Sequence, residues 1–171
     1  MTISMYQASV PVFSHVLESL SAILDKASAY AEAKKIEPSA LIQSRLKPDM
    51  QPFSFQIKMA AFAAHNTVAR LAGLQEIGVQ DNDTTFPELK ARIDKTLAFL
   101  KTVKPEQLEG SEERTIQLKM GPREVAFKGQ AYLLHFAQLN FFFHVTTAYA
   151  LLRHNGLDLG KRDFIGQVIT G

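Results

Sequence analysis

The stretch that most constrains this chain runs from Tyr132 to Gly156 and carries no charged side chain before Arg153. Apolar side chains occur on every side of the helix that it would form. A helix that is hydrophobic all round must be enclosed by other helices, by a second subunit, or by both. Three of the five histidines also lie in this stretch, so buried chemistry is expected here first.

This apolar run nearly has the length of a membrane span, but polar side chains interrupt it. They include Gln130, His135, Gln138, Asn140 and His144. Histidines and side-chain amides are costly in lipid, so we expect no membrane association. The first residues lack the basic and apolar regions of a signal peptide, and the chain has no cysteine. Both observations favour a cytoplasmic protein without disulfides or thiolate metal sites.

The charges are balanced and scattered along the chain. Lysine and arginine together number 19, against 17 acidic residues. The longest basic clusters are Lys34-Lys35 and Lys161-Arg162, which are too short for a nucleic-acid footprint. We therefore expect no nucleic-acid partner.

Helical periodicity dominates the first hundred residues. One repeat with steps of four and three indicates a long bundle helix. Its members are Tyr6, Val10, Phe13, Leu17, Leu20, Leu24, Ala27 and Ala31. Pro11 cannot donate a hydrogen bond to the carbonyl of Gln7, which predicts either a kink or a helix that begins near Ser9.

A second helix is predicted to begin at Pro52 and to end before Gly73. Its expected buried face consists of Phe55, Met59, Phe62, Asn66 and Ala69. A third helix has the clearest start, because Thr85 and Glu88 form a capping-box pattern. Its apolar face comprises Phe86, Leu89, Ile93, Leu97, Leu100 and Val103, and Pro105 ends it.

Apolar and polar residues alternate from Thr115 to Met120 and again after Gly121-Pro122, which predicts a short β-hairpin. A fourth helix should run from about Lys128 to Asn155. The tail from Leu157 to Gly171 is expected to pack in part through Phe164 and Ile165.

These segments predict an all-α fold, a four-helix bundle with a short β-hairpin between helices three and four. Residues 1–171 are expected to form a single domain. The connection between helices two and three has about ten residues, and the one between helices three and four about twenty. The longer connection can cross the end of the bundle, so the helix order stays open.

Most of the histidines have a structural explanation that requires no catalysis or metal binding. His15 lies opposite the apolar repeat of the first helix and is expected to be solvated. His154 should favour the dipole of a helix C-terminus, and His65 lies beside the face of the second helix. His135 and His144 are nine residues apart, about 180° around a helix, so they cannot ligate one metal.

Asn140 and His144 share one face of the fourth helix. A polar pair on an otherwise apolar stripe indicates either a buried hydrogen-bonded network or the floor of a pocket. The network, satisfied across the bundle, is favoured because buried polar groups are nearly always hydrogen-bonded.

The fourth helix resembles the last helix of the DinB/YfiT-like superfamily. The resemblance rests on His144, Leu151-Leu152-Arg153 and Gly156 at their mutual offsets. The whole stretch is closer still to a bacterial family of unknown function within that superfamily, as are the segments Ala69–Gly73 and Thr85–Leu89. The resemblance implies a four-helix bundle that is usually dimeric. It also implies kinship with metal-dependent thiol transferases and isomerases that use three histidine ligands.

The chain departs from that pattern at the metal ligands. The second ligand of the superfamily precedes the matching histidine by four residues, where this chain has Asn140. The first ligand falls around Ala61 and Phe62, and His65 comes nearly a turn too late. Amide groups ligate first-row metals weakly, so we expect a degenerate metal site and no cofactor.

Two classes of function remain open. The first is a non-enzymatic bundle that binds a small molecule or a protein, with His65, Asn140 and His144 as the candidate pocket. The alternative is a metal-dependent thiol transferase-like enzyme that uses His144, with His65 as a further ligand. The residues favour the first class, and the metal content of the purified protein would distinguish the two.

A homodimer is expected from three consecutive phenylalanines. Phe141, Phe142 and Phe143 point in directions about 100° apart, so one bundle core cannot easily shelter all three. The predicted interface buries part of the fourth helix or of its neighbour, the first helix.

Overall fold

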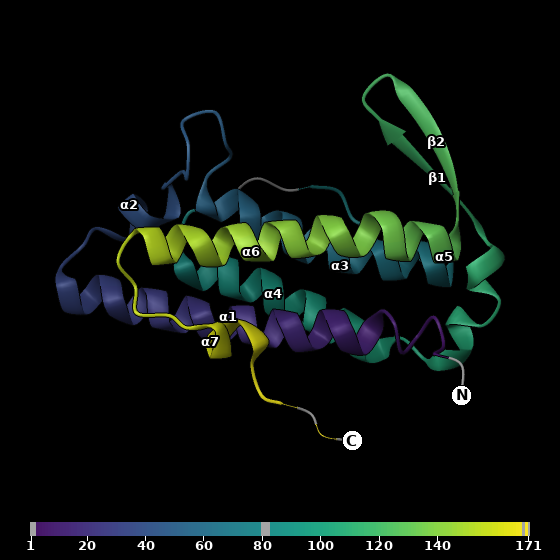
Figure 1. The fold of residues 1–171 in the computed structure, drawn as a ribbon, viewed down its shortest axis with the longest axis horizontal. Coiled ribbons are helices and arrows are strands. Elements are labelled where there is room, and N and C mark those ends of the chain that lie inside the picture. Colours follow the sequence, from purple (N-terminus) through teal and green to yellow (C-terminus); the bar gives the residue numbers. More distant parts are fainter. Residues whose placement is uncertain (1–2, 80–82, 169, 171) are drawn as a thin grey trace.

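In the computed structural model, which describes residues 3–79, 83–168 and 170, four long helices form a bundle (Figure 1). They are α1 (Val10–Lys34), α3 (Phe53–Ala72), α4 (Phe86–Thr102) and α6 (Gln138–His154). Shorter helices are α2 (Pro38–Ile42), η1 (Pro105–Leu108), η2 (Ser111–Glu113), α5 (Gly129–Tyr132), η3 (Leu133–Ala137) and α7 (Lys161–Ile165). The strands β1 (Thr115–Met120) and β2 (Arg123–Lys128) form an antiparallel hairpin. The predicted helical bundle with a hairpin is thereby confirmed.

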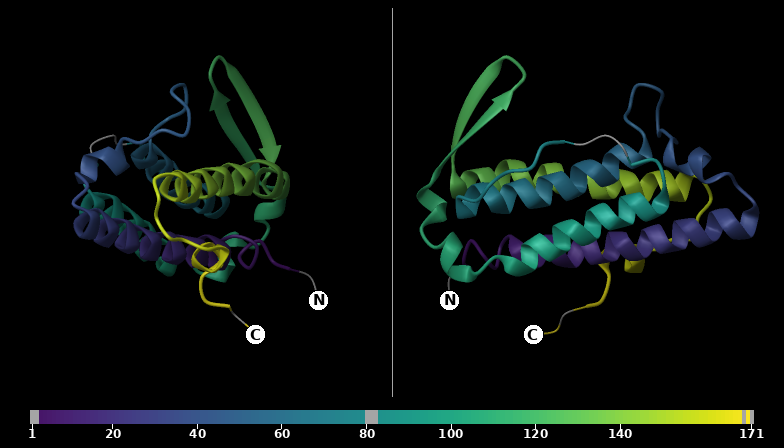
Figure 2. Two further views of the ribbon diagram at one scale, coloured as in Figure 1. Left: turned by 60° about the vertical axis from the view of Figure 1, so that its left-hand side comes forward. Right: turned by 180° about the vertical axis from the view of Figure 1, so that it is seen from behind.

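The bundle has two layers, with α6 and α3 in one and α1 and α4 in the other (Figures 1 and 2). Helices α3 and α4 run in the same direction, so the link between them has to return along the bundle. The sequence indicated that the longer connection after the third helix could cross the bundle. The shorter link between α3 and α4 makes the return instead.

Local sequence signals set where the helices begin. Helix α1 begins at Val10 with Pro11 in its first turn, so the proline starts the helix and does not kink it. Thr85 and Glu88 form the predicted capping box at the start of α4. Gly73 ends α3 in a left-handed conformation with φ of 68°.

The predicted apolar faces are correct for α1 and α4 but only half correct for α3. On α3, the side chains of Phe55, Met59 and Phe62 are half-buried. The fully buried apolar residues lie on a neighbouring stripe that includes Phe53, Ile57, Ala60, Ala64, Val68 and Leu71. Helix α3 is apolar on nearly every side, so periodicity alone could not choose between the two stripes.

The predicted fourth helix is interrupted near its start. Leu133–Ala137 forms one π-helical turn between α5 and α6. After this turn Phe141 is fully buried, Phe142 is half-buried, and Phe143 is 56% exposed. No described helix combines the length and hydropathy that a membrane span requires.

The C-terminal segment corrects the expectation that His15 is solvated. His15 is half-buried, and its Nε2 lies 2.6 Å from the carbonyl oxygen of Ile165. Phe164 packs edge-on against Tyr149, with ring centroids 6.0 Å apart. The tail therefore lies over α1 and the end of α6, with Phe164 packed as expected, whereas the side chain of Ile165 is 43% exposed.

Gly129 joins the hairpin to the last helix where the backbone is crowded. A Cβ atom there would lie 1.9 Å from the carbonyl oxygen of Ser111, which belongs to η2. The contact is with backbone, so a side chain can be accommodated only if the chain shifts.

We therefore expect Gly129→Ala to lower the free energy of unfolding by about 3 kcal/mol in urea titrations. Gly78→Ala is the matched control, because a Cβ atom at Gly78 would meet nothing within 4 Å. Equal stabilities of the two variants would contradict the packing described here.

Candidate functional site

His144 is a buried, hydrogen-bonded residue of the α3–α6 interface. Its side chain is 8% exposed, and its Nδ1 lies 2.8 Å from Oε1 of Gln56 on α3. The amide nitrogen of Gln56 donates to the carbonyl oxygen of Gln51, so its oxygen accepts from the histidine. Burial lowers the pKa of His144 to about 4, which keeps the ring neutral at physiological pH.

Asn140 does not share this hydrogen bond. It lies one turn before His144 on α6 and is half-buried, and its side chain forms no hydrogen bond within the described part of the chain. The predicted network around His144 is therefore built with Gln56 and not with Asn140. Nothing in the sequence points to Gln56, because a single glutamine on an apolar helix does not reveal its partner.

His65 lies on the opposite side of α3 from Gln56. The two residues are nine positions apart, about 180° around the helix. The imidazole of His65 stacks on the ring of Phe99 from α4, with centroids 3.7 Å apart. The structure therefore separates His65 from Asn140 and His144, and the three predicted pocket residues do not form one pocket.

The residues present do not fit the metal centre that the superfamily resemblance implies. His144 binds Gln56 through Nδ1, a contact that a metal-bound histidine could also make, but the two other ligand positions hold Asn140, which offers only an amide, and Ala61, a buried alanine. Within residues 3–79, 83–168 and 170, no three histidine or carboxylate side chains converge as metal ligands do. The side chains around His144 therefore support no metal-dependent mechanism.

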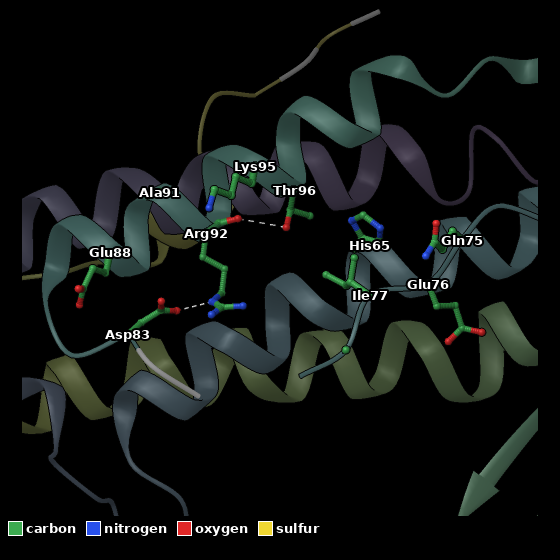
Figure 3. A pocket seen from close by; sticks show the side chains of 11 residues that line it. His65, Gln75, Glu76, Ile77, Asp83, Glu88, Ala91, Arg92, Lys95 and Thr96 are labelled. Atoms are coloured by element: carbon green, nitrogen blue, oxygen red, sulfur yellow. Dashed lines mark hydrogen bonds and ion pairs between the residues drawn. The ribbon is translucent and has the colours of Figure 1, made fainter. Parts of the chain in front are cut away.

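His65 instead lines a cleft of about 620 Å³ between α3, α4 and the link that joins them (Figure 3). This volume lies within the range typical of small-molecule sites. One wall of the cleft is formed by His65 of α3 and by Gln75–Gly78 of the link. The opposite wall is formed by α4. The lining residues of α4 are Glu88, Ala91, Arg92, Lys95 and Thr96.

Asn66 holds the link against α3. Its side-chain amide donates to the carbonyl oxygen of Ile77 and accepts from the Ile77 amide, both at 2.9 Å. Asn66 is 1% exposed, so these two hydrogen bonds are shielded from water. This pairing satisfies both backbone groups of Ile77 as a neighbouring strand would.

Two further side chains of α3 lie beside the same segment. Arg70 pairs with Glu76 at 2.5 Å and donates to the hydroxyl of Tyr132 at 2.8 Å. Burial lowers the pKa of His65, and the backbone of Gln75 opposes this lowering.

An ion pair between Arg92 and Asp83 stands at the other end of the cleft. Lys58 of α3 lies near both residues and is 5% exposed. Burial lowers the pKa of the Lys58 ammonium, the Asp83 carboxylate opposes this, and Arg92 adds to it. The link residues Glu76, Ile77 and Asp83 thus meet Arg70, Asn66 and Lys58 in turn, which run backwards along α3.

Comparison with known proteins agrees with this architecture. A crystal structure of a DinB family member protein from Shewanella denitrificans matches with a TM-score of 0.87 and 35% sequence identity. The match covers 96% of this chain and 93% of that one. The fold therefore places the protein among DinB-like helical bundles.

The particular family follows from the sequence model that the chain matches. Residues 5–165 match the domain of unknown function DUF1993, and the chain belongs to that family. No curated protein matches the chain significantly.

The buried His144 predicts how stability depends on pH. Its folded pKa of about 4 lies below the value of about 6.5 expected in the unfolded chain, so the unfolded state binds the proton more tightly. The contribution of the neutral His144 to the free energy of unfolding is therefore complete above pH 6.5 and is lost as the pH falls toward 4. The loss from this residue is expected to reach about 3 kcal/mol.

Urea unfolding at a series of pH values measures this loss, with His144→Gln as the comparison. The variant should show a shallower slope of unfolding free energy between pH 6.5 and 4. Parallel curves for the two proteins would mean that His144 titrates normally and is not buried as described.

Proposed function

We propose that this protein is a non-catalytic bundle that binds a small molecule in the cleft between α3, α4 and their link. The observation that carries the proposal is the double hydrogen bond between Asn66 and Ile77, because it fixes one wall of the cleft in advance. A wall ordered before binding reduces the entropy that a ligand must overcome. The cleft volume of about 620 Å³ suits a ligand of metabolite size.

The candidate pocket deduced from the sequence is revised accordingly. His65 stays in it, while His144 and Asn140 belong to the α3–α6 interface. The alternative function, a metal-dependent thiol transferase-like enzyme using His144, has less support. Asn140 and Ala61 occupy the two other ligand positions, and no three histidine or carboxylate side chains converge within the described chain.

Screening a fragment library of mixed charge by amide chemical-shift mapping tests the binding site. We expect the hits to shift the amides of residues 65, 75–78 and 91–96. Asn66→Leu should abolish these shifts and lower the unfolding free energy by about 2 kcal/mol, because both backbone groups of Ile77 lose their partner.

Asn140→Leu provides the matched control. The substitution is the same, but Asn140 is half-buried without a hydrogen bond in the described chain. Fragment binding should persist, with a change in stability below about 1 kcal/mol. Hits that cluster around His144, or shifts that survive in the Asn66 variant, would contradict the proposed site.

We further propose that two copies associate through the outer face of α3 and α6. On α6, Leu139 is 63% exposed and Phe143 is 56% exposed. Phe55 of α3 and Phe143 both pack edge-on against the ring of His144. The ring centroids of the two phenylalanines lie 6.2 and 5.4 Å from that of His144. This face continues onto α3, which is a closer neighbour of α6 than α1 is.

Sedimentation velocity at micromolar concentration measures this association. We expect a dimer for the unmodified protein and a folded monomer for Phe143→Glu, because a charge in an apolar interface is costly to desolvate. Ile165→Glu is the control, since Ile165 is 43% exposed on α7, away from this face. A monomeric unmodified protein would exclude the interface.

A further inference from the structure

Some charged side chains of the cleft have partners within the protein and one does not, and this difference indicates which class of ligand the cleft binds. Glu76 is paired with Arg70, and Asp83 with Arg92. The Glu88 carboxylate accepts from the backbone amides of Thr84 and Thr85 at 2.7 and 3.0 Å. Each carboxylate that lines the cleft in the described chain is thus already bound within the protein.

Lys95 is different. It extends from α4 on the same side of the cleft as Arg92 and Thr96, opposite Ile77 and His65 (Figure 3). Its ammonium has no hydrogen bond or ion pair with any residue that the structure describes. The charge left for a ligand is therefore positive, and it favours an anion.

His65 adds a second preference. Burial lowers the pKa of its imidazole, which favours the neutral ring with a proton on one nitrogen. The other nitrogen of a neutral imidazole carries a lone pair and can only accept a hydrogen bond. A ligand that supplies a donor can therefore pair with His65.

The surfaces between these two groups are partly apolar. Ile77, whose backbone is held by Asn66, is 39% exposed, and Ala91 lies on α4 along the cleft. His65 itself is stacked on Phe99, which fixes the plane of its ring. A compact apolar body fits between a cation on one side and an acceptor on the other.

We infer that the cleft binds a small organic acid whose carboxylate pairs with Lys95 and whose hydroxyl or N–H group donates to His65. This inference rests on the proposed binding function and names its ligand class. Asn66 and Arg70 act as positioning residues, because they hold the wall that the ligand contacts. The acid would bridge Lys95 of α4 and His65 of α3, and would stabilise the packing of the two helices across the cleft.

Three matched compounds test the inference by NMR titration. 4-Hydroxyphenylacetate carries both groups, 4-hydroxyphenylacetamide lacks the charge, and phenylacetate lacks the hydroxyl donor. We expect the first to shift the cleft amides and to bind about tenfold more tightly than either of the others. Lys95→Gln should remove the advantage of the acid over its amide, and His65→Phe the advantage of the hydroxyl.

Lys101→Gln is the control, because Lys101 is an exposed lysine on the same helix outside the cleft. The acid and the amide binding equally at the cleft would overturn the ligand class and leave the binding function intact. No cleft shifts with any of these compounds or with the fragment library would overturn both. An advantage of the acid that persists in Lys95→Gln would show that another cation holds the carboxylate, and would overturn the assignment to Lys95.

Discussion

The parallel arrangement of α3 and α4 is the constraint on which the rest of the structure depends. Two consecutive helices that run the same way need a link that returns along the length of the first. Helix α3 has 20 residues and is about 30 Å long, and the described part of the link begins its return along that length at Gly73. An extended segment without a neighbouring strand leaves its backbone groups unpaired.

Helix α3 supplies the missing partners along its flank. Asn66 satisfies both backbone groups of Ile77, and Arg70 pairs with Glu76. The link is thereby held away from α4, and the space between them is the cleft. On the other side of α3, Gln56 satisfies His144. The helix thus has one polar contact directed at α6 and a polar row directed at the link.

The sequence predicted those features that short-range chemistry decides. Thr85 and Glu88 are three residues apart and form their capping box whatever surrounds them. The apolar repeats of the first and third helices are unambiguous because polar residues cover their other sides. The face of α3 was not predictable in this way, since Phe55 and Phe53 are equally apolar and only one of them is fully buried.

The candidate site depended on long-range information. Asn66 looks like one polar member of an apolar face, and its partner is the backbone of a residue eleven positions later. Nothing in a link of about ten residues says that it returns along the preceding helix. The sequence correctly places His65 beside the core. Its distance from His144 becomes visible only once Gln56 fixes the orientation of α3.

We propose that His144 stabilises the α3–α6 interface through its hydrogen bond to Gln56 and binds no metal, and that His65 lines the ligand-binding cleft. Long-range nitrogen–proton NMR spectra of the imidazoles, recorded at pH 7 with and without stoichiometric zinc, test this claim most directly. We predict a neutral His144 that is protonated on Nδ1 and whose nitrogen shifts do not respond to zinc. A zinc-dependent shift of the His144 nitrogens, with one equivalent of metal bound, would contradict the claim and make the metal-dependent enzyme the better account of the protein.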